Sequence, residues 1–236
     1  MTRYIWQRPE WPNWRWSASE ISRGLEDVQR KQDYLAGLAQ ALDTDHLSLA
    51  VAELTTRETV STSAIEGVRL DPDEVRSSIM RRLGLGAASQ DIDRLAPAAQ
   101  GMIDVLADST QNLRKLTLGR LFAWHGALFP SGRSGLSLIL VGMLRGEDPM
   151  QILSGPIGRE RVHYEAPPRA GLEDEMRRFL YWFNGSREDG ATLRASIAHL
   201  WFETLHPFED GNGRLGRAVF DLALAQGAGF HSQRTS

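Results

Sequence analysis

The sequence predicts a mainly α protein with a small β element in its second half. Apolar residues recur at three- and four-residue spacing through most of the chain, as expected for amphipathic helices. Glycine and proline clusters separate these stretches, and the sequence shows no internal repeat. Residues 132–158 instead hold short apolar runs between glycines, which predicts turns and a small hairpin.

The N-terminal helical region is expected over residues 1–90. We assign its four early tryptophans to fixing the N-terminal arm against helices rather than to a ligand cage. The next helix could be capped by Ser17 or Ser19, and its apolar stripe should pack on a core. This stripe comprises Ile21, Leu25, Val28, Leu35, Leu38 and Leu42. Helices are then predicted over 46–66 and from Asp71-Pro72 through Arg81, followed by a loop over 84–89.

A second region, the core, is expected over residues 91–226. Its first helices are predicted over 92–106 and 117–128, and Pro130 ends the second of them. A short strand at 161–164 continues the hairpin region. Helices resume over 172–183 and 191–205, and the second of these leads directly to His206.

Composition limits the classes of function. A chain of 236 residues, 42% of them hydrophobic, can bury a substantial core. Cysteine is absent, which excludes disulfides and thiolate metal sites. No signal-peptide core and no run of roughly 20 apolar residues is present, so we expect a cytoplasmic protein with no membrane partner. A net charge of −3 provides no basic surface, so we expect no nucleic acid partner.

The segment 206–217, HPFEDGNGRLGR, joins two predicted helices through a polar turn. Gly211 and Gly213 permit positive φ and close approach to the backbone, so the amides of the turn can form an anion nest at a helix N-terminus. Arg214 and Arg217 are three residues apart, and their guanidinium groups can hold further phosphate oxygens. Phosphate is therefore the expected ligand.

Two other residues of this segment supply chemistry. Asp210 offers hard oxygen ligands beside the nest and suits a magnesium ion that bridges phosphates. His206 can accept a proton near neutral pH. Phe208, between polar neighbours, is interpreted as the anchor that buries the turn. An ordinary interhelical loop explains each feature separately, but explains their combination within one segment poorly.

This segment resembles the signature of Fic proteins, His-x-Phe-x-(Asp or Glu)-Gly-Asn-Gly-Arg-x-x-Arg, and matches every fixed position. The resemblance implies a Fic-type helical bundle with a small β-hairpin flap. It also implies that a Ser, Thr or Tyr hydroxyl of a target protein, deprotonated by His206, attacks the α-phosphate of ATP. In that family pattern Asp210 holds Mg²⁺, while Gly211, Asn212 and Gly213 cradle phosphates. Arg214 and Arg217 hold the outer phosphates.

Two segments are similar to less specific features of the family. Arg161, Val162, His163 and Tyr164 resemble the flap, whose backbone can pair with an extended target; an ordinary surface hairpin is the alternative. Residues 62–67, TSAIEG, are similar to the inhibitory motif (Ser or Thr)-x-x-x-Glu-(Gly or Asn), which would make the helix over about 46–67 inhibitory. Glu66 would lie at the negative end of that helix, where it needs a cation, and Arg217 is the candidate. The alternative is a solvated glutamate.

The similarity to one group of Fic proteins includes the tryptophan-rich opening and residues 29–42. Relatives with this arrangement usually continue past the motif helix. This chain closes with GAGFHSQRTS, so we expect residues 227–236 to be a disordered or truncated tail.

The resemblance therefore implies a protein nucleotidyltransferase that moves AMP from ATP to a target hydroxyl and is inhibited by Glu66. The enzymatic alternatives are transfer of UMP, phosphocholine or a bare phosphate. Gly213 argues against the last, because that position resembles Lys in the phosphate-transferring branch. The alternative from another class is a truncated, non-catalytic protein that binds nucleotide or regulates. The sequence does not identify the target protein, for which the chain itself is one candidate, and a homo-oligomer is one of the states left open.

Overall fold

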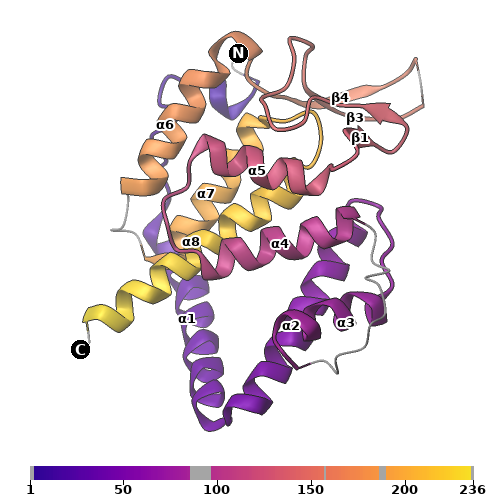
Figure 1. Ribbon diagram of the computed structural model, residues 1–236. Helices are drawn as coiled ribbons and strands as arrows, with labels where there is room; N and C mark the ends of the chain where they lie inside the picture. The colour runs from indigo at the N-terminus through magenta and orange to yellow at the C-terminus, as the bar shows by residue number, and fades with distance from the viewer. Residues whose placement is uncertain (1–2, 86–96, 157, 186–189, 235–236) are drawn as a thin grey trace.

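The computed structural model describes residues 3–85, 97–156, 158–185 and 190–234. These ranges contain eight α-helices and two small β-hairpins, which confirms the mainly α class (Figure 1). None of the helices within them is both long and apolar enough to cross a lipid bilayer.

Three helices form the N-terminal part: α1 (Ala18–Ala41), α2 (Thr44–Ile65) and α3 (Pro72–Arg82). Their starts follow local rules. Asp43 precedes α2 and accepts the N–H of His46, and Asp71 precedes α3 and accepts the N–H of Asp73 at 2.8 Å. Figure 1 shows α1 and α2 diverging from their short connection.

The predicted burial of the α1 stripe is wrong. No residue of α1 is buried, and Leu35 and Leu38 are 62% and 47% exposed. The start of the stripe, at Ile21 and Leu25, is half-buried where α1 contacts α7, but the rest of the helix extends away from the core and its stripe is uncovered (Figure 1). Ser17 precedes the helix as expected, but its side chain makes no cap and its Oγ instead lies 3.0 Å from Oγ of Ser19.

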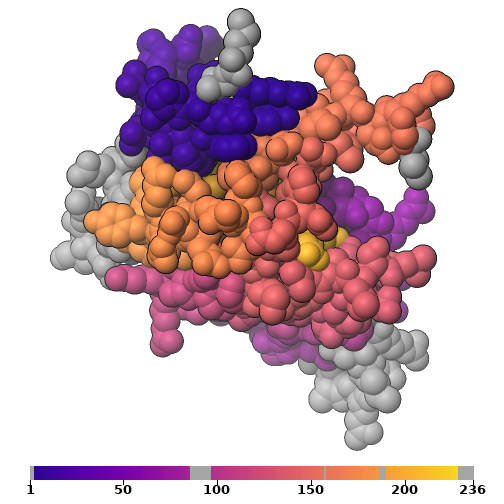
Figure 2. Space-filling model, turned by 90° about the horizontal axis from the view of Figure 1, so that it is seen from above, coloured from indigo at the N-terminus to yellow at the C-terminus, as the bar shows by residue number. Residues whose placement is uncertain are grey.

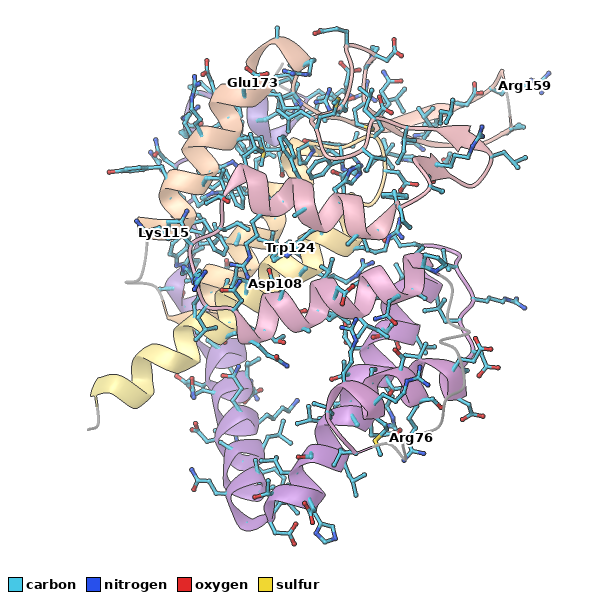
Figure 3. All side chains as sticks on the ribbon, in the orientation of Figure 1. Arg76, Asp108, Lys115, Trp124, Arg159 and Glu173 are labelled. Atoms are coloured by element: carbon cyan, nitrogen blue, oxygen red, sulfur yellow. The ribbon has the colours of Figure 1, made fainter. Side chains whose placement is uncertain are left out.

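Five helices surround the main core. They are α4 (Pro97–Gln111), α5 (Leu118–Leu128), α6 (Leu172–Gly185), α7 (Ala191–Leu205) and α8 (Asn212–Arg234). The central pair is α7 and α8, which pack along each other on either side of the motif turn. Fully buried phenylalanines fill the space between the helices, among them Phe179, Phe202 and Phe208. Asp108 on α4 accepts the Nε1–H of Trp124 on α5 at 2.7 Å, which joins those two helices (Figure 3).

These helices follow the predicted ranges with three exceptions. The helix predicted to end at residue 106 runs to Gln111. Residues 92–96 of the predicted fourth helix and residues 86–89 of the predicted loop lie outside the described residues. At the other end, α8 runs to Arg234 and so includes most of the segment expected to be a tail.

Two antiparallel hairpins lie between α5 and α6 in the sequence. Strand β1 (Arg133–Ser134) pairs with β2 (Ser137–Leu138), and β3 (Gln151–Ser154) pairs with β4 (Arg161–Glu165). The pairing of β3 with β4 is the hairpin that the sequence suggested.

The N-terminal arm packs on the core through tryptophans. The rings of Trp11 and Trp14 meet that of Trp201 on α7 edge-on, with centroids 5.7 and 6.1 Å apart. Figure 2 shows the indigo arm lying beside the orange segment that contains α6. The arm therefore has the fixing role that we expected.

Candidate active site

The motif turn between α7 and α8 is held in shape by its own side chains. The side chain of Asn212 accepts the N–H of Phe208 at 3.0 Å and donates to its carbonyl oxygen at 2.8 Å. Gly211 has a φ of 78°, and a Cβ there would lie 2.7 Å from the Phe129 ring, so both conformation and space require glycine. Asn212 is only 2% exposed, so its side chain shapes the turn from within.

The anion nest predicted at this turn coincides with the first residues of α8. That helix begins at Asn212, and its first internal bond runs from the N–H of Leu215 to the carbonyl of Gly211. The preceding amides have no partner within the helix and are the groups that bind anions at helix N-termini. A Cβ on Gly213 would overlap Oε1 of Glu66, so the Glu66 carboxylate lies directly over this position.

The two arginines differ in their surroundings. Arg214 is 8% exposed, its guanidinium lies over the Phe129 ring at 4.8 Å, and its Nε has no hydrogen-bond partner. Burial lowers the pKa of Arg214, which shows that its charge is poorly solvated. A buried guanidinium with an unused donor can bind an anion strongly.

Arg217 is engaged by the C-terminal end of α2. Its Nη2 donates to Oε1 of Glu66 at 2.8 Å and to the carbonyl of Thr62 at 3.2 Å, while its Nε donates to Oγ1 of Thr62. The pairing of Glu66 with Arg217 expected from the sequence is thus present. It links residues 151 positions apart.

Asp210 is the residue that could hold a cation. Its carboxylate accepts the N–H of Gly211 at 2.5 Å and the hydroxyl of Ser134, and its side chain is 37% exposed. The described ranges contain no cluster of three acidic or histidine side chains that could hold a metal. A magnesium ion at Asp210 would therefore take its other ligands from substrate phosphates and water, which its preference for retained waters permits.

His206 ends α7 in the left-handed conformation, with a φ of 47°. Its ring Nδ1 lies 3.3 Å from the carbonyl oxygen of Glu203. Burial lowers the pKa of His206, and the nearby Arg145 guanidinium acts in the same direction. The imidazole is therefore neutral at neutral pH and able to accept a proton.

Several residues of the site were not found from the sequence. Arg145 is 2% exposed, and its Nε donates to the His206 carbonyl at 2.9 Å. His125 is fully buried and stacks on Phe208 with ring centroids 4.3 Å apart. Its Nδ1 accepts the N–H of Gly142, so its Nε2 donates to the Asp210 carbonyl at 3.2 Å. Its contact with Asp210 spans 85 positions, and no local pattern signals such a contact.

The predicted flap residues lie on β4. Tyr164 faces the core, where its hydroxyl donates to the carbonyl of Thr204 at 2.6 Å. Two carbonyl groups of β4 are occupied by the N-terminal arm: that of Val162 accepts from Arg3 and that of Glu165 accepts from Trp6, both at 2.8 Å. The remaining flap residues are Arg161, which is exposed, and His163, whose Nε2 contacts Oγ of Ser154. The edge of β4 is therefore partly covered by the chain itself.

Two parts of the chain are similar to known domains. Residues 4–85 match a domain of unknown function, DUF4172, and residues 115–224 match the Fic/DOC family. A uridine 5′-monophosphate transferase of Xanthomonas campestris pv. campestris is 33% identical over 117 residues. This alignment covers 46% of the chain and 21% of the relative. A probable protein adenylyltransferase of Aquifex aeolicus is 30% identical over 63 residues, covering 27% of the chain and 20% of the relative.

A solved structure shows the same fold. The crystal structure of a Fic family protein from Desulfovibrio desulfuricans superposes with a TM-score of 0.60 at 24% identity. The superposition covers 90% of the chain and 59% of that structure. The chain thus spans about a fifth of each curated relative and less than two thirds of the structural one. The matched sequence, the motif turn and the shared fold together show that residues 115–224 are a domain of the Fic/DOC family.

Proposed function

We propose that the chain transfers AMP from ATP to a Ser, Thr or Tyr hydroxyl of a target protein. The observation that carries this proposal is the convergence of four groups on one turn. These are the neutral imidazole of His206, the carboxylate of Asp210, the N-terminus of α8 and the buried guanidinium of Arg214. Placing a base beside an anion-binding helix end suits attack of a hydroxyl on a phosphate. The relatives named as nucleotidyl transferases support the same reaction class.

Each residue has a role in the proposed reaction. His206 takes the proton of the target hydroxyl, the hydroxyl oxygen bonds to the α-phosphorus, and the bond from that phosphorus to pyrophosphate breaks. The amides at the start of α8 and Arg214 bind the phosphates. Asp210 would hold Mg²⁺, which neutralises phosphate charge when bound. Positioning and charge neutralisation supply most of the rate in this chemistry.

Glu66 is proposed to keep the site inactive. Its carboxylate lies over Gly213 and pairs with Arg217, so it occupies the place and the cation that outer phosphates would use. The two side chains are 25% and 23% exposed, so solvent screens the pair only in part.

UMP transfer is the second candidate, because one relative is named as a UMP transferase. The groups described above bind phosphates, which ATP and UTP share, so they do not distinguish adenine from uracil.

The test supplies the chain with ATP labelled at the α- or γ-phosphate, or with α-labelled UTP, in the presence of candidate target proteins. Glu66→Gly serves as the active form and His206→Ala as its matched control. We expect protein label from α-labelled ATP alone, and none with His206→Ala, which should still bind nucleotide. Label from UTP alone would support the second candidate. Label from the γ-position, or equal label with His206→Ala, would contradict the proposed reaction.

A further inference from the structure

Glu203 is a carboxyl group beside the proposed base that the motif does not include. It lies on α7 three residues before His206, and its carboxyl group lies close to the imidazole. Its Oε2 is 3.9 Å from Nδ1 of His206, and its Oε1 is 3.8 Å from Nε2 of His199. The carboxyl group therefore lies between two imidazoles.

The environment of Glu203 is unusual for a structural glutamate. Its side chain is 29% exposed, yet Oε1 is completely buried and accepts no hydrogen bond. An unsatisfied buried oxygen destabilises the fold, and natural proteins retain few of them. Burial raises the pKa of Glu203 to about 7, so the group changes charge in the range where a histidine base operates.

The adjacent helix leaves room for this carboxyl group. A Cβ on Gly216 of α8 would overlap Oε1 of Glu203, so the absence of a side chain at Gly216 is what admits the glutamate. Position 216 is variable in the signature that residues 206–217 match, so the phosphate-binding pattern does not by itself require glycine there. Gly216 thus provides the space that the Glu203 carboxyl group occupies between α7 and α8.

Both oxygen-bearing groups of residue 203 face the same nitrogen of the base. The backbone carbonyl is 3.3 Å from Nδ1 of His206 and the carboxyl oxygen is 3.9 Å from it. A proton on Nδ1 is thereby favoured, which leaves Nε2 free to accept one. The longer distance is that of an ion pair rather than a hydrogen bond, and such contacts often tighten when substrate binds.

Resting on the proposed function, we propose that Glu203 is a positioning residue that fixes the tautomer of His206 and stabilises its imidazolium during transfer. The proton leaves the target hydroxyl for Nε2 of His206 as the oxygen–phosphorus bond forms and pyrophosphate departs. The resulting positive ring presents its Nδ1–H to the Glu203 carboxylate. The arrangement corresponds in its physics to a carboxylate that orients a catalytic histidine and does not itself take the proton.

The inhibitory pair influences the same carboxyl group. The negative charge of Glu66 raises the pKa of Glu203, and the positive charge of Arg217 lowers it. His199, the remaining titratable neighbour, has a pKa lowered by its own burial and by Arg217. Withdrawal of Glu66 would leave Arg217 to act alone, which favours the Glu203 carboxylate. Withdrawal of Glu66 would then both open the phosphate site and favour ionisation of Glu203.

The experiment compares Glu203→Gln and Glu203→Asp with their parent, all in the Glu66→Gly background. Glu173→Gln is the matched control, because Glu173 is 62% exposed on α6 and lies at the outer end of that helix (Figure 3). Thermal unfolding checks that each variant folds. We expect Glu203→Gln to lower kcat about tenfold to a hundredfold, the effect of losing one charge-assisted contact, with little change in KM for ATP. Glu203→Asp should recover part of the loss.

The second readout does not depend on turnover. In the parent, NMR titration of the His206 ring should show two steps, because the ring and the carboxyl group titrate as a coupled pair. Glu203→Gln should leave one step, and the kcat profile should lose the rise that ionisation of Glu203 gives the parent. In the Glu66→Gly background that rise should lie below pH 7, because the negative charge of Glu66 no longer raises the pKa of Glu203. Identical His206 titration curves in parent and Glu203→Gln would overturn the proposal even if kcat falls. If no variant transfers AMP, the proposed function fails, while the titration still decides the role of Glu203.

Discussion

Two neighbouring carboxylates in the motif turn have different surroundings. Glu209 accepts the N–H of Leu140 at 2.9 Å and that of Gly146 at 3.4 Å, so it fixes the loop between β2 and β3. Asp210 contacts Ser134 and its own neighbour Gly211, and it retains exposed oxygen. The two adjacent carboxylates therefore have different roles. Glu209 supports the loop, and Asp210 is suited to hold a metal ion.

This difference leads to a prediction about metal dependence. Asp210→Asn should remove the response of the transfer rate to Mg²⁺, because an amide is a poor ligand for a hard cation. Glu209→Ala should keep that response and instead lower the free energy of unfolding by about 1–3 kcal/mol, since it leaves backbone donors without an acceptor. Rates over a Mg²⁺ titration and urea unfolding measure the two effects. Equal loss of the Mg²⁺ response in both variants would refute the assignment.

The pair of Glu66 and Arg217 leads to a second prediction at this scale. Glu66→Gly should raise the transfer rate by about one to two orders of magnitude, because the charge-assisted contact no longer competes with phosphate. Adding Arg217→Ala should cancel the gain, since the freed site then lacks its cation. Glu53→Ala, which alters an exposed ion pair on the same helix, is the control. The measurement is the initial rate at equal ATP, and an unchanged rate in Glu66→Gly would remove the inhibitory role.

At the scale of elements, the predictions that succeeded rest on local information. The start of α3 was predicted at Asp71-Pro72, and Asp71 accepts backbone N–H groups within the next three residues. The motif turn is equally local, because the side chain of Asn212 bonds to both backbone groups of Phe208 within it. Such features can be predicted from sequence because their partners lie within one or two turns.

The failures concern contacts between distant segments. The apolar spacing of α1 correctly predicted a helix, but an apolar stripe does not show which other element covers it, and Leu35 is 62% exposed. His125, Arg145 and Ser134 reach the turn from other elements, and nothing in their own sequence neighbourhoods marks them. The contact of Glu66 with Arg217 is the exception among distant contacts. Its motif was recognisable, and a carboxylate at the C-terminal end of a helix is destabilised unless a cation lies near it.

The close packing of α4 on α5 gives a prediction about these elements. A Cβ on Gly101 of α4 would overlap the backbone carbonyl of Ala127 on α5, which cannot move aside as a side chain could. Gly101→Ala should therefore destabilise the protein by about 1–3 kcal/mol by forcing the helices apart. Gly126→Ala on α5 is the control, because nothing lies within 4 Å of its added Cβ. It should stabilise the helix by about 0.5–1 kcal/mol. Urea unfolding that shows the same change in both variants would contradict this account of the interface.

At the scale of the whole molecule, the N-terminal helices meet the Fic domain mainly where α2 packs on α4, and side chains of α2 also reach α8. One end of this contact holds Glu66 and Arg217, which attract. Farther along lies a groove of about 360 Å³ lined mainly by apolar side chains, with Asp221 of α8 and Glu58 of α2 on its wall. These two carboxylates repel, and burial together with the charge of Glu58 raises the pKa of Asp221 to about 6. The same interface thus combines an attractive pair with a repulsive one.

The repulsive pair makes the stability of the molecule depend on pH. The pKa of Asp221 rises from its ordinary value of 3.8 in the unfolded chain to about 6 in the folded one, so the folded state holds the proton more tightly. Protonated Asp221 therefore stabilises the folded state, fully below pH 4, and this stabilisation is lost as the pH rises through 6. Asp221→Asn keeps the shape and removes the ionisation. It should therefore raise the Tm, and by more at pH 7.5 than at pH 5, where the folded carboxyl group is still largely protonated.

Asp174→Asn is the control, because that side chain is 69% exposed and its change should leave the Tm the same at both pH values. Calorimetry at the two pH values gives the comparison. A gain that is equal at both, or larger at pH 5, would show that Asp221 is not held protonated at this interface.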